Sequence, residues 1–173
     1  MHGYKCFNSD MTNRYGDKFE VGKKYSITGN VKVGPNGNGF HICENFEDTL
    51  KYFGALNESV VICEVIGSGE IVADWDDYYG YEKFAVSNLE IVRVLPREEI
   101  IQMGLQLHEI RADRFVQVFK LKEEEIPLFE EKYGSYIKIL KSIEYYQKNN
   151  KHVYEKDSEF ESEYFKTRKR KIN

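Results

Sequence analysis

Long apolar runs and paired cysteines are absent from this sequence of 173 residues. No stretch approaches the ~20 consecutive apolar residues that a transmembrane helix requires, and the first residues lack the apolar segment of a secretory signal. The three cysteines are odd in number and include no Cys-x-x-Cys pair, which argues against a disulfide framework. We therefore expect a cytoplasmic protein without membrane contact, whose thiols are reduced and lie in or near the core.

Sequence motifs of the common enzyme classes are also missing. The chain contains no GxGxxG, no Walker glycine-lysine loop, no GxSxG and no HExxH. His41 and Cys43 lack the paired spacing that is typical of zinc ligands. No calcium loop matches the spacing of four clustered carboxylates, Asp74, Asp76, Asp77 and Glu82. We expect no metal site, because buried thiols and a solvated acidic loop explain these residues more simply.

The overall composition is that of a globular protein with a charged surface. Apolar residues make up 41% and charged residues 31% of the chain, and 13 Tyr and 11 Phe predict a core rich in aromatic side chains. Residues 1–96 hold 14 acidic and 9 basic residues, whereas positive charges gather in the tail Lys166-Thr167-Arg168-Lys169-Arg170-Lys171. We therefore expect no contact with nucleic acid except through this tail.

Residues 1–96 have the pattern of short strands joined by glycine turns. Runs of alternating or continuous apolar residues predict strands at residues 4–7, 24–33, 40–43, 59–66, 70–75 and 84–95. One short helix is expected after the third of these strands. Asn45 is a good N-cap there, and an apolar stripe follows at i, i+4 and i+7, namely Phe46, Leu50 and Phe53.

After Pro96 the apolar period changes to that of a helix. Two helical stripes are predicted, one of Ile100, Met103, Gly104, Leu107 and Ile110, the other of Ile137, Leu140, Ile143 and Tyr146. Residues 114–122 alternate well enough for a strand, but we interpret them as helix. The sequence thus predicts an α+β protein: a small mixed or antiparallel β module over residues 1–96 with one short helix, then a helical module over residues 97–173 that includes the basic tail.

The segment Gly37-Asn38-Gly39-Phe40-His41-Ile42-Cys43 is the strongest candidate for a functional site. Its glycines lead into a short strand that ends directly in a helix, a corner at which side chains converge on ligands. On a strand, His41 and Cys43 project from one face, and Phe40 and Ile42 project from the other. We expect one face to pack and the face of His41 to act on a ligand. A hydrogen-bonded structural histidine is the alternative.

Several motifs together resemble a family of uncharacterised bacterial and phage-borne domains. The resemblance covers about residues 3–96 and rests on Tyr4-Lys5-x-Phe7, Phe19-Glu20-Val21-Gly22-Lys23-x-Tyr25, Gly39-Phe40-His41-x-Cys43-Glu44, Asp48-x-x-x-Tyr52 and Gly69-Glu70-Ile71. The order of strands, glycine loop and helix is also distantly similar to the mono-ADP-ribosyltransferase fold. In that fold a basic residue on the first strand binds the ribose of NAD, an aromatic residue faces the nicotinamide, and a glutamate stabilises an oxocarbenium-like ribose.

The likeness to the transferases implies a site for NAD. It implies catalytic roles for His41 and Glu82, and it assigns cofactor binding to Tyr4, Lys5, Gly39 and Tyr52. The chain departs from the pattern in two places, because the first strand carries Lys in place of Arg or His and Gly80 stands where Gln or Glu would be usual. We expect Lys5, His41 and residues 74–82 to border one groove.

Two functions are predicted from these observations. The first is a phage- or mobile-element-type cytosolic protein whose ADP-ribosyltransferase-like module, active or degenerate, binds NAD and acts on a host macromolecule. The alternative is a non-catalytic anti-defence inhibitor of the anti-CRISPR kind, which binds a host protein and blocks its nucleic-acid site with an acidic, tyrosine-rich surface. A weaker third interpretation makes the basic tail, with nearby tyrosines, a nucleic-acid contact.

Overall fold

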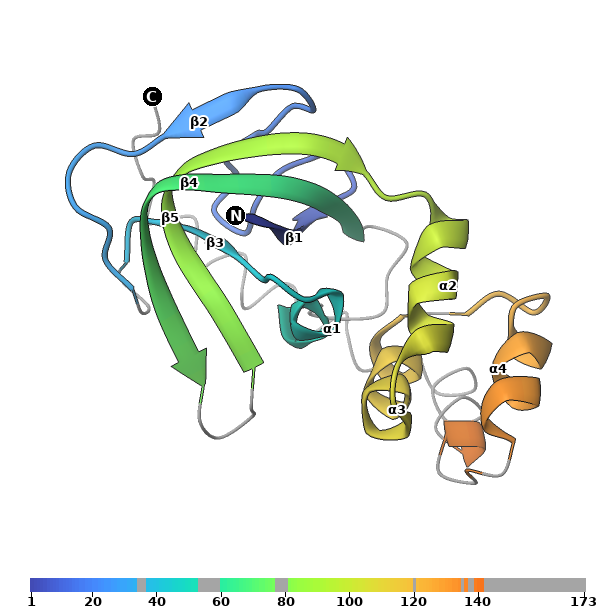
Figure 1. The fold of residues 1–173 in the computed structure, drawn as a ribbon. Helices are drawn as coiled ribbons and strands as arrows, with labels where there is room; N and C mark the ends of the chain where they lie inside the picture. The colour runs from blue at the N-terminus through green and yellow to red at the C-terminus, as the bar shows by residue number, and fades with distance from the viewer. Residues whose placement is uncertain are drawn as a thin grey trace.

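The computed structural model describes residues 1–33, 37–52, 60–76, 81–119, 121–134, 136 and 139–141. An antiparallel sheet of five strands comes first and a group of helices follows it, which confirms the expected α+β class (Figure 1). The strands are β1 (His2–Asn8), β2 (Lys24–Ser26), β3 (Phe40–Ile42), β4 (Val60–Asp76) and β5 (Tyr81–Val94). The helices are α1 (Phe46–Thr49), continued by a 3₁₀ turn (Leu50–Tyr52), then α2 (Arg97–Gln106), α3 (Glu109–Val118) and α4 (Ile126–Tyr133).

The long hairpin of β4 and β5 organises the sheet. Two separate strands were expected at residues 59–66 and 70–75, and this is wrong, because β4 runs through 17 residues with a register shift between Ser68 and Ile71. Gly69 lies in this bulge with φ of 78°, and a Cβ there would meet the Ser87 hydroxyl, so both backbone and space require glycine. Figure 1 shows that the hairpin bends sharply partway along its length.

The remaining strands line both edges of the hairpin and curl the sheet. β1 pairs with the first half of β4, whereas β2 and β3 both pair with β5. Tyr4 and Cys43 also exchange two backbone hydrogen bonds of 2.6 and 2.9 Å, so β1 meets the end of β3. The curled sheet encloses an inner apolar cluster of Phe7, Phe19, Phe40, Ile42, Cys63, Val65, Val86, Leu89 and Ile91.

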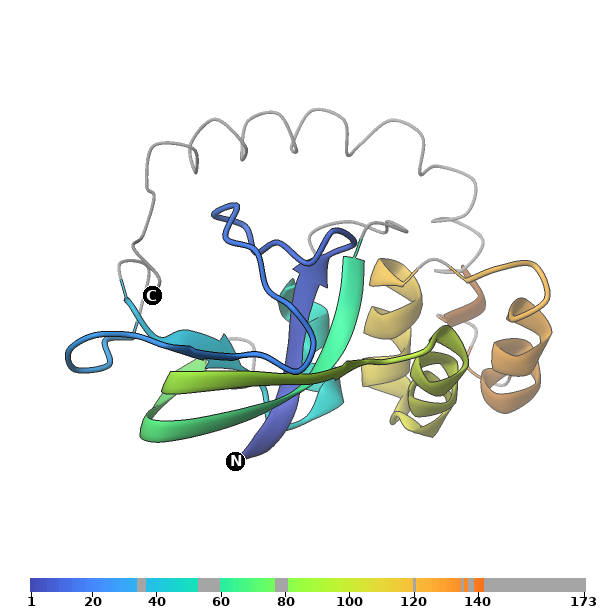
Figure 2. The ribbon, with the colours of Figure 1, turned by 90° about the horizontal axis from the view of Figure 1, so that it is seen from above.

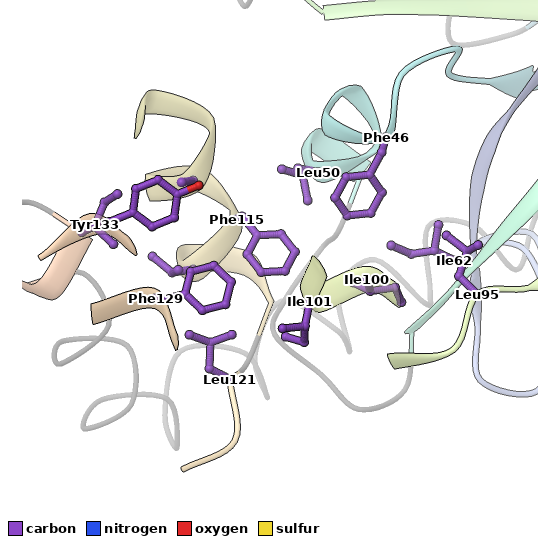
Figure 3. Packing of buried hydrophobic residues seen from close by; sticks show 13 residues of the cluster. Phe46, Leu50, Ile62, Leu95, Ile100, Ile101, Phe115, Leu121, Phe129 and Tyr133 are labelled. Carbon is purple, nitrogen blue, oxygen red and sulfur yellow. The ribbon is translucent and has the colours of Figure 1, made fainter. Parts of the chain in front are cut away.

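A second apolar cluster joins the sheet to the helices. Phe115 of α3 is fully buried at its centre, with the rings of Phe119 and Phe129 stacked at centroid distances of 4.9 and 5.6 Å. Figure 3 shows Phe46 and Leu50, which follow β3, packing toward these helical side chains. The helices α2, α3 and α4 gather beyond one end of the sheet (Figure 2). The short helix after β3 therefore connects the candidate corner to the larger core.

The helical region differs in detail from its predicted stripes. α2 ends at Gln106, because Leu107 has extended backbone angles (φ −67°, ψ 152°), so Ile110 belongs to the next helix and is 68% exposed. Helix is confirmed for residues 114–118, where α3 ends, and most of the stripe over residues 137–146 lies outside the described residues. Asn45 occupies the predicted N-cap position, but its side chain makes no cap hydrogen bond. Within the described ranges, no helix has the length and apolar character to cross a membrane.

Candidate functional site

His41 stands at the centre of the predicted corner, on the side of β3 that faces away from the inner cluster. Its neighbours Phe40 and Ile42 are 6% and 1% exposed and belong to that cluster. His41 itself pairs across the sheet with Ala85 of β5, and its side chain stays 32% exposed. The expected division into a packing face and an accessible face therefore exists at this strand.

Two charged side chains from the hairpin lie beside the imidazole. The Nε2 atom of His41 is 4.0 Å from Oδ2 of Asp74, and the Nζ atom of Lys83 is 3.0 Å from the same oxygen. Asp74 and Lys83 are register partners on β4 and β5, so the sheet itself holds them together. Each of these two side chains is 22% exposed, and partial burial strengthens the attraction between their charges compared with an ion pair in water. The arrangement presents an imidazole, a carboxylate and an ammonium group on one face.

Lys5 of β1 lies on the side of β3 opposite to the imidazole. It projects from the same face of β1 as Phe7, and its Nζ atom lies 5.6 Å from the centre of the Phe7 ring. The same atom donates a hydrogen bond of 2.7 Å to the backbone oxygen of His41. The pKa of this lysine is lowered from 10.5 to about 8, mainly by burial and to a smaller extent by the charge of Arg14, while nearby thiols act in the other direction. Lys5 thus contacts the peptide of His41 rather than its imidazole.

Tyr4 and Gly39 have structural contacts that account for their positions. Tyr4 makes the backbone bridge to Cys43 and packs edge-on against Phe46, with 6.1 Å between the ring centres. A Cβ atom on Gly39 would lie 2.9 Å from the Cβ of Ala85 and 3.0 Å from Cγ1 of Val31, so the close packing beside β5 favours glycine. Their proposed contacts with a ligand stay predictions.

The side chains of Glu82 and Tyr52 lie outside the described part of the structure. The backbone of Glu82 is described: it is the register partner of Trp75 and directly precedes Lys83. Ala85, the partner of His41, is three residues further along β5, which is about 10 Å of extended chain. The backbone at Glu82 is therefore within reach of a ligand the size of a nucleotide that contacts His41.

The three cysteines do not contribute reactive thiolates. Burial raises the pKa of Cys43 to about 12 and that of Cys63 to about 11, and it raises the pKa of Cys6 even more. A thiol must lose its proton to act as a nucleophile or to bind zinc. Over the described ranges, no group of three His, Cys, Asp or Glu side chains is arranged to hold a metal ion.

Lys83 is the member of this site that sequence analysis missed. Asp74 was expected near His41 only as part of an acidic loop, but it is the strand partner of Lys83. The available signal was that each residue lies two positions from the facing strand ends, Asp76 and Tyr81, which puts the two residues opposite each other in a hairpin. That signal becomes usable only once residues 60–76 are recognised as one strand.

Comparison with known proteins finds a family but no annotated relative. No curated protein matches the chain, and no solved structure matches it. A family model described as a domain of unknown function, DUF7666, matches residues 1–103, which include the whole sheet, the corner and most of α2. This chain therefore belongs to the DUF7666 family.

Proposed function

We propose that the β module binds NAD over the face of His41 and transfers ADP-ribose to a host macromolecule. The observation that carries the proposal is the partly exposed imidazole of His41, with Asp74 Oδ2 at 4.0 Å and the Lys83 ammonium group 3.0 Å from that same oxygen. An imidazole offers a flat ring for the nicotinamide, an ammonium group attracts the pyrophosphate, and a carboxylate accepts hydrogen bonds from ribose hydroxyls.

Glu82 completes the proposed reaction. The bond between C1′ of the ribose and the nicotinamide nitrogen breaks, and its electron pair leaves with nicotinamide. The positive charge that develops on the ribose is stabilised by the Glu82 carboxylate. The acceptor nucleophile then bonds to C1′, and its proton passes to that carboxylate. The assignment of this role to Glu82 rests on the resemblance to the transferases.

Calorimetry with NAD and with ADP-ribose tests the binding step. Wild-type protein should give a saturable heat signal, and His41→Ala should weaken it at least ~10-fold if the ring supplies ~1.4 kcal/mol or more of the binding energy. His108→Ala is the matched control, because His108 is also beside a carboxylate, Glu109 at 3.0 Å, but its side chain is 75% exposed and far from β3 in the sequence. The control should bind like wild type.

Labelled NAD tests the transfer step. Host lysate incubated with the wild type should contain a labelled macromolecule, and Glu82→Gln should abolish labelling while it retains binding. Absence of heat at millimolar NAD, where even a Kd of ~1 mM would register, would overturn the proposal. Stoichiometric capture of an unlabelled host protein in that case would favour the non-catalytic inhibitor.

A further inference from the structure

β1 meets the end of β3 along a short contact, here called the β1–β3 seam, in which backbone pairing stops after one bridge. Their described contact is a single backbone bridge, Tyr4 with Cys43. Continued antiparallel register would place Cys6 opposite His41 as the next hydrogen-bonded pair. The ammonium group of Lys5 is bonded to the His41 oxygen at this level instead, at 2.7 Å. A side chain thus continues the connection that the backbone begins.

The cost of placing a lysine at this seam suggests a specific role. The titratable and charged groups that act on Lys5 come from every neighbouring segment: Cys6 on its own strand, Cys43 after β3, Cys63 on β4, and Arg14 in the loop after β1. Since the pKa values of these thiols are raised, they are neutral near pH 7 and do not balance the ammonium charge. A methionine could fill the same space without a buried charge.

We propose that Lys5 is a positioning residue, which ties β1 to the peptide of His41 and thereby fixes the imidazole on the opposite face of β3. The peptide oxygen and the side chain belong to the same residue, so a shift of that peptide turns the ring relative to Asp74. The consequence for ligand binding rests on the function proposed above, but the mechanical link between Lys5 and the ring does not.

Hydrogen exchange and NMR of Lys5→Met test this link. The amides of Tyr4 and Cys43 form the bridge beside the Lys5 contact, and loss of a charge-assisted hydrogen bond should speed their exchange by about 10-fold or more relative to amides of the β4–β5 hairpin. The ring resonances of His41 should shift, and those of His108 should not.

Conservative and surface variants separate positioning from general destabilisation. Lys5→Arg keeps donors for the His41 oxygen and should restore most of the exchange protection and the ring shift. Lys24→Met, which removes an exposed strand lysine that pairs with Glu90 at 3.2 Å, should leave both measurements unchanged. Unaltered Tyr4 and Cys43 exchange together with an unaltered His41 ring in folded Lys5→Met would overturn the inference.

A measurement on wild-type protein covers the case in which Lys5→Met does not fold. Burial lowers the pKa of Lys5 to about 8, so the His41 ring signals should show an inflection near pH 8. The charged groups that face the ring, Asp74 and Lys83, both lie on the β4–β5 hairpin. Absence of that inflection would also overturn the link. Failure of NAD binding in wild type would refute the proposed function alone.

Discussion

Replacing Lys5 by methionine should change how the free energy of unfolding depends on pH. The folded protein lowers the pKa of Lys5 from 10.5 to about 8, so below pH 8 both states are protonated and the full cost of the buried charge is present. Between pH 8 and 10.5 the folded state gives up its proton while the unfolded state keeps it. Wild-type stability relative to Lys5→Met should therefore rise across this range.

The size of this rise follows from the same pKa difference. At ~1.4 kcal/mol for each tenfold change in proton affinity, the upper limit is ~3 kcal/mol, and the partial solvent access of the Lys5 side chain reduces the expected rise to about 1–2 kcal/mol. The buried thiols act in the opposite direction. Because the pKa values of Cys43 and Cys63 are raised to about 12 and 11, the unfolded state loses thiol protons first, and stability falls above pH ~9.

Urea denaturation at several pH values between 7 and 11, followed by tryptophan fluorescence or circular dichroism, measures both effects. The burial of the thiols is common to wild type and Lys5→Met, so this part of their contribution cancels in the difference. The charge of Lys5 lowers the thiol pKa values in the wild type alone, so the two proteins are compared between pH 8 and 10, below the raised pKa values of these thiols. Lys24→Met provides the control. The Lys24 side chain is 77% exposed, so the difference in unfolding free energy between wild type and Lys24→Met should be nearly constant with pH. A wild-type minus Lys5→Met difference that is also flat between pH 8 and 10 would refute the assignment of a buried, charged Lys5.

Three further substitutions, two of them with a comparison variant, test the packing of the fold by urea denaturation at neutral pH. Phe115→Ala should cost ~3–5 kcal/mol, because it empties the centre of the helical cluster. Tyr133→Phe should cost ~1–2 kcal/mol, because the Tyr133 hydroxyl donates to carbonyl oxygens at the end of α2, with a distance of 2.7 Å to Leu107. Tyr25→Phe should cost less, because the Tyr25 hydroxyl accepts a hydrogen bond from the exposed amide of Glu20. Gly69→Ala should cost more than Gly22→Ala, since both have positive φ but only Gly69 is crowded.

Much of the fold could be predicted from local patterns. The strand at β1, the short apolar strand before a helix, and the change from strands to helices at Pro96 all appear in the periodicity of the sequence. Each depends on side chains that are near in sequence and share one face, which is what periodicity records. The break at Leu107 was missed for the same reason, because apolar spacing continues across it although the backbone does not stay helical.

The length of β4 could not be predicted from local patterns. Gly67, Ser68 and Gly69 look like a turn, since glycine and serine are common there, but in the structure they form a bend inside one strand. Local sequence does not distinguish a bulge from a hairpin turn, because the difference lies in whether β5 continues alongside. Because β5 pairs with both halves of β4, residues 67–69 form a bulge and not a hairpin turn.

The candidate site depends on the same long-range pairing, and this explains why the hydrogen bond from Lys5 to the His41 peptide could not be predicted. Lys5 was expected to bind a ligand because it is a basic residue on the first strand. Strand alternation places it with Phe7, toward the inner cluster, whereas His41 faces the other way. Lys5 and His41 are connected through the hydrogen bond from the Lys5 ammonium group to the His41 peptide oxygen, and not through a shared groove. If Lys5 positions the ring, substitutions at Lys5 and His41 should be non-additive in ligand binding, because once the ring is removed its position no longer matters.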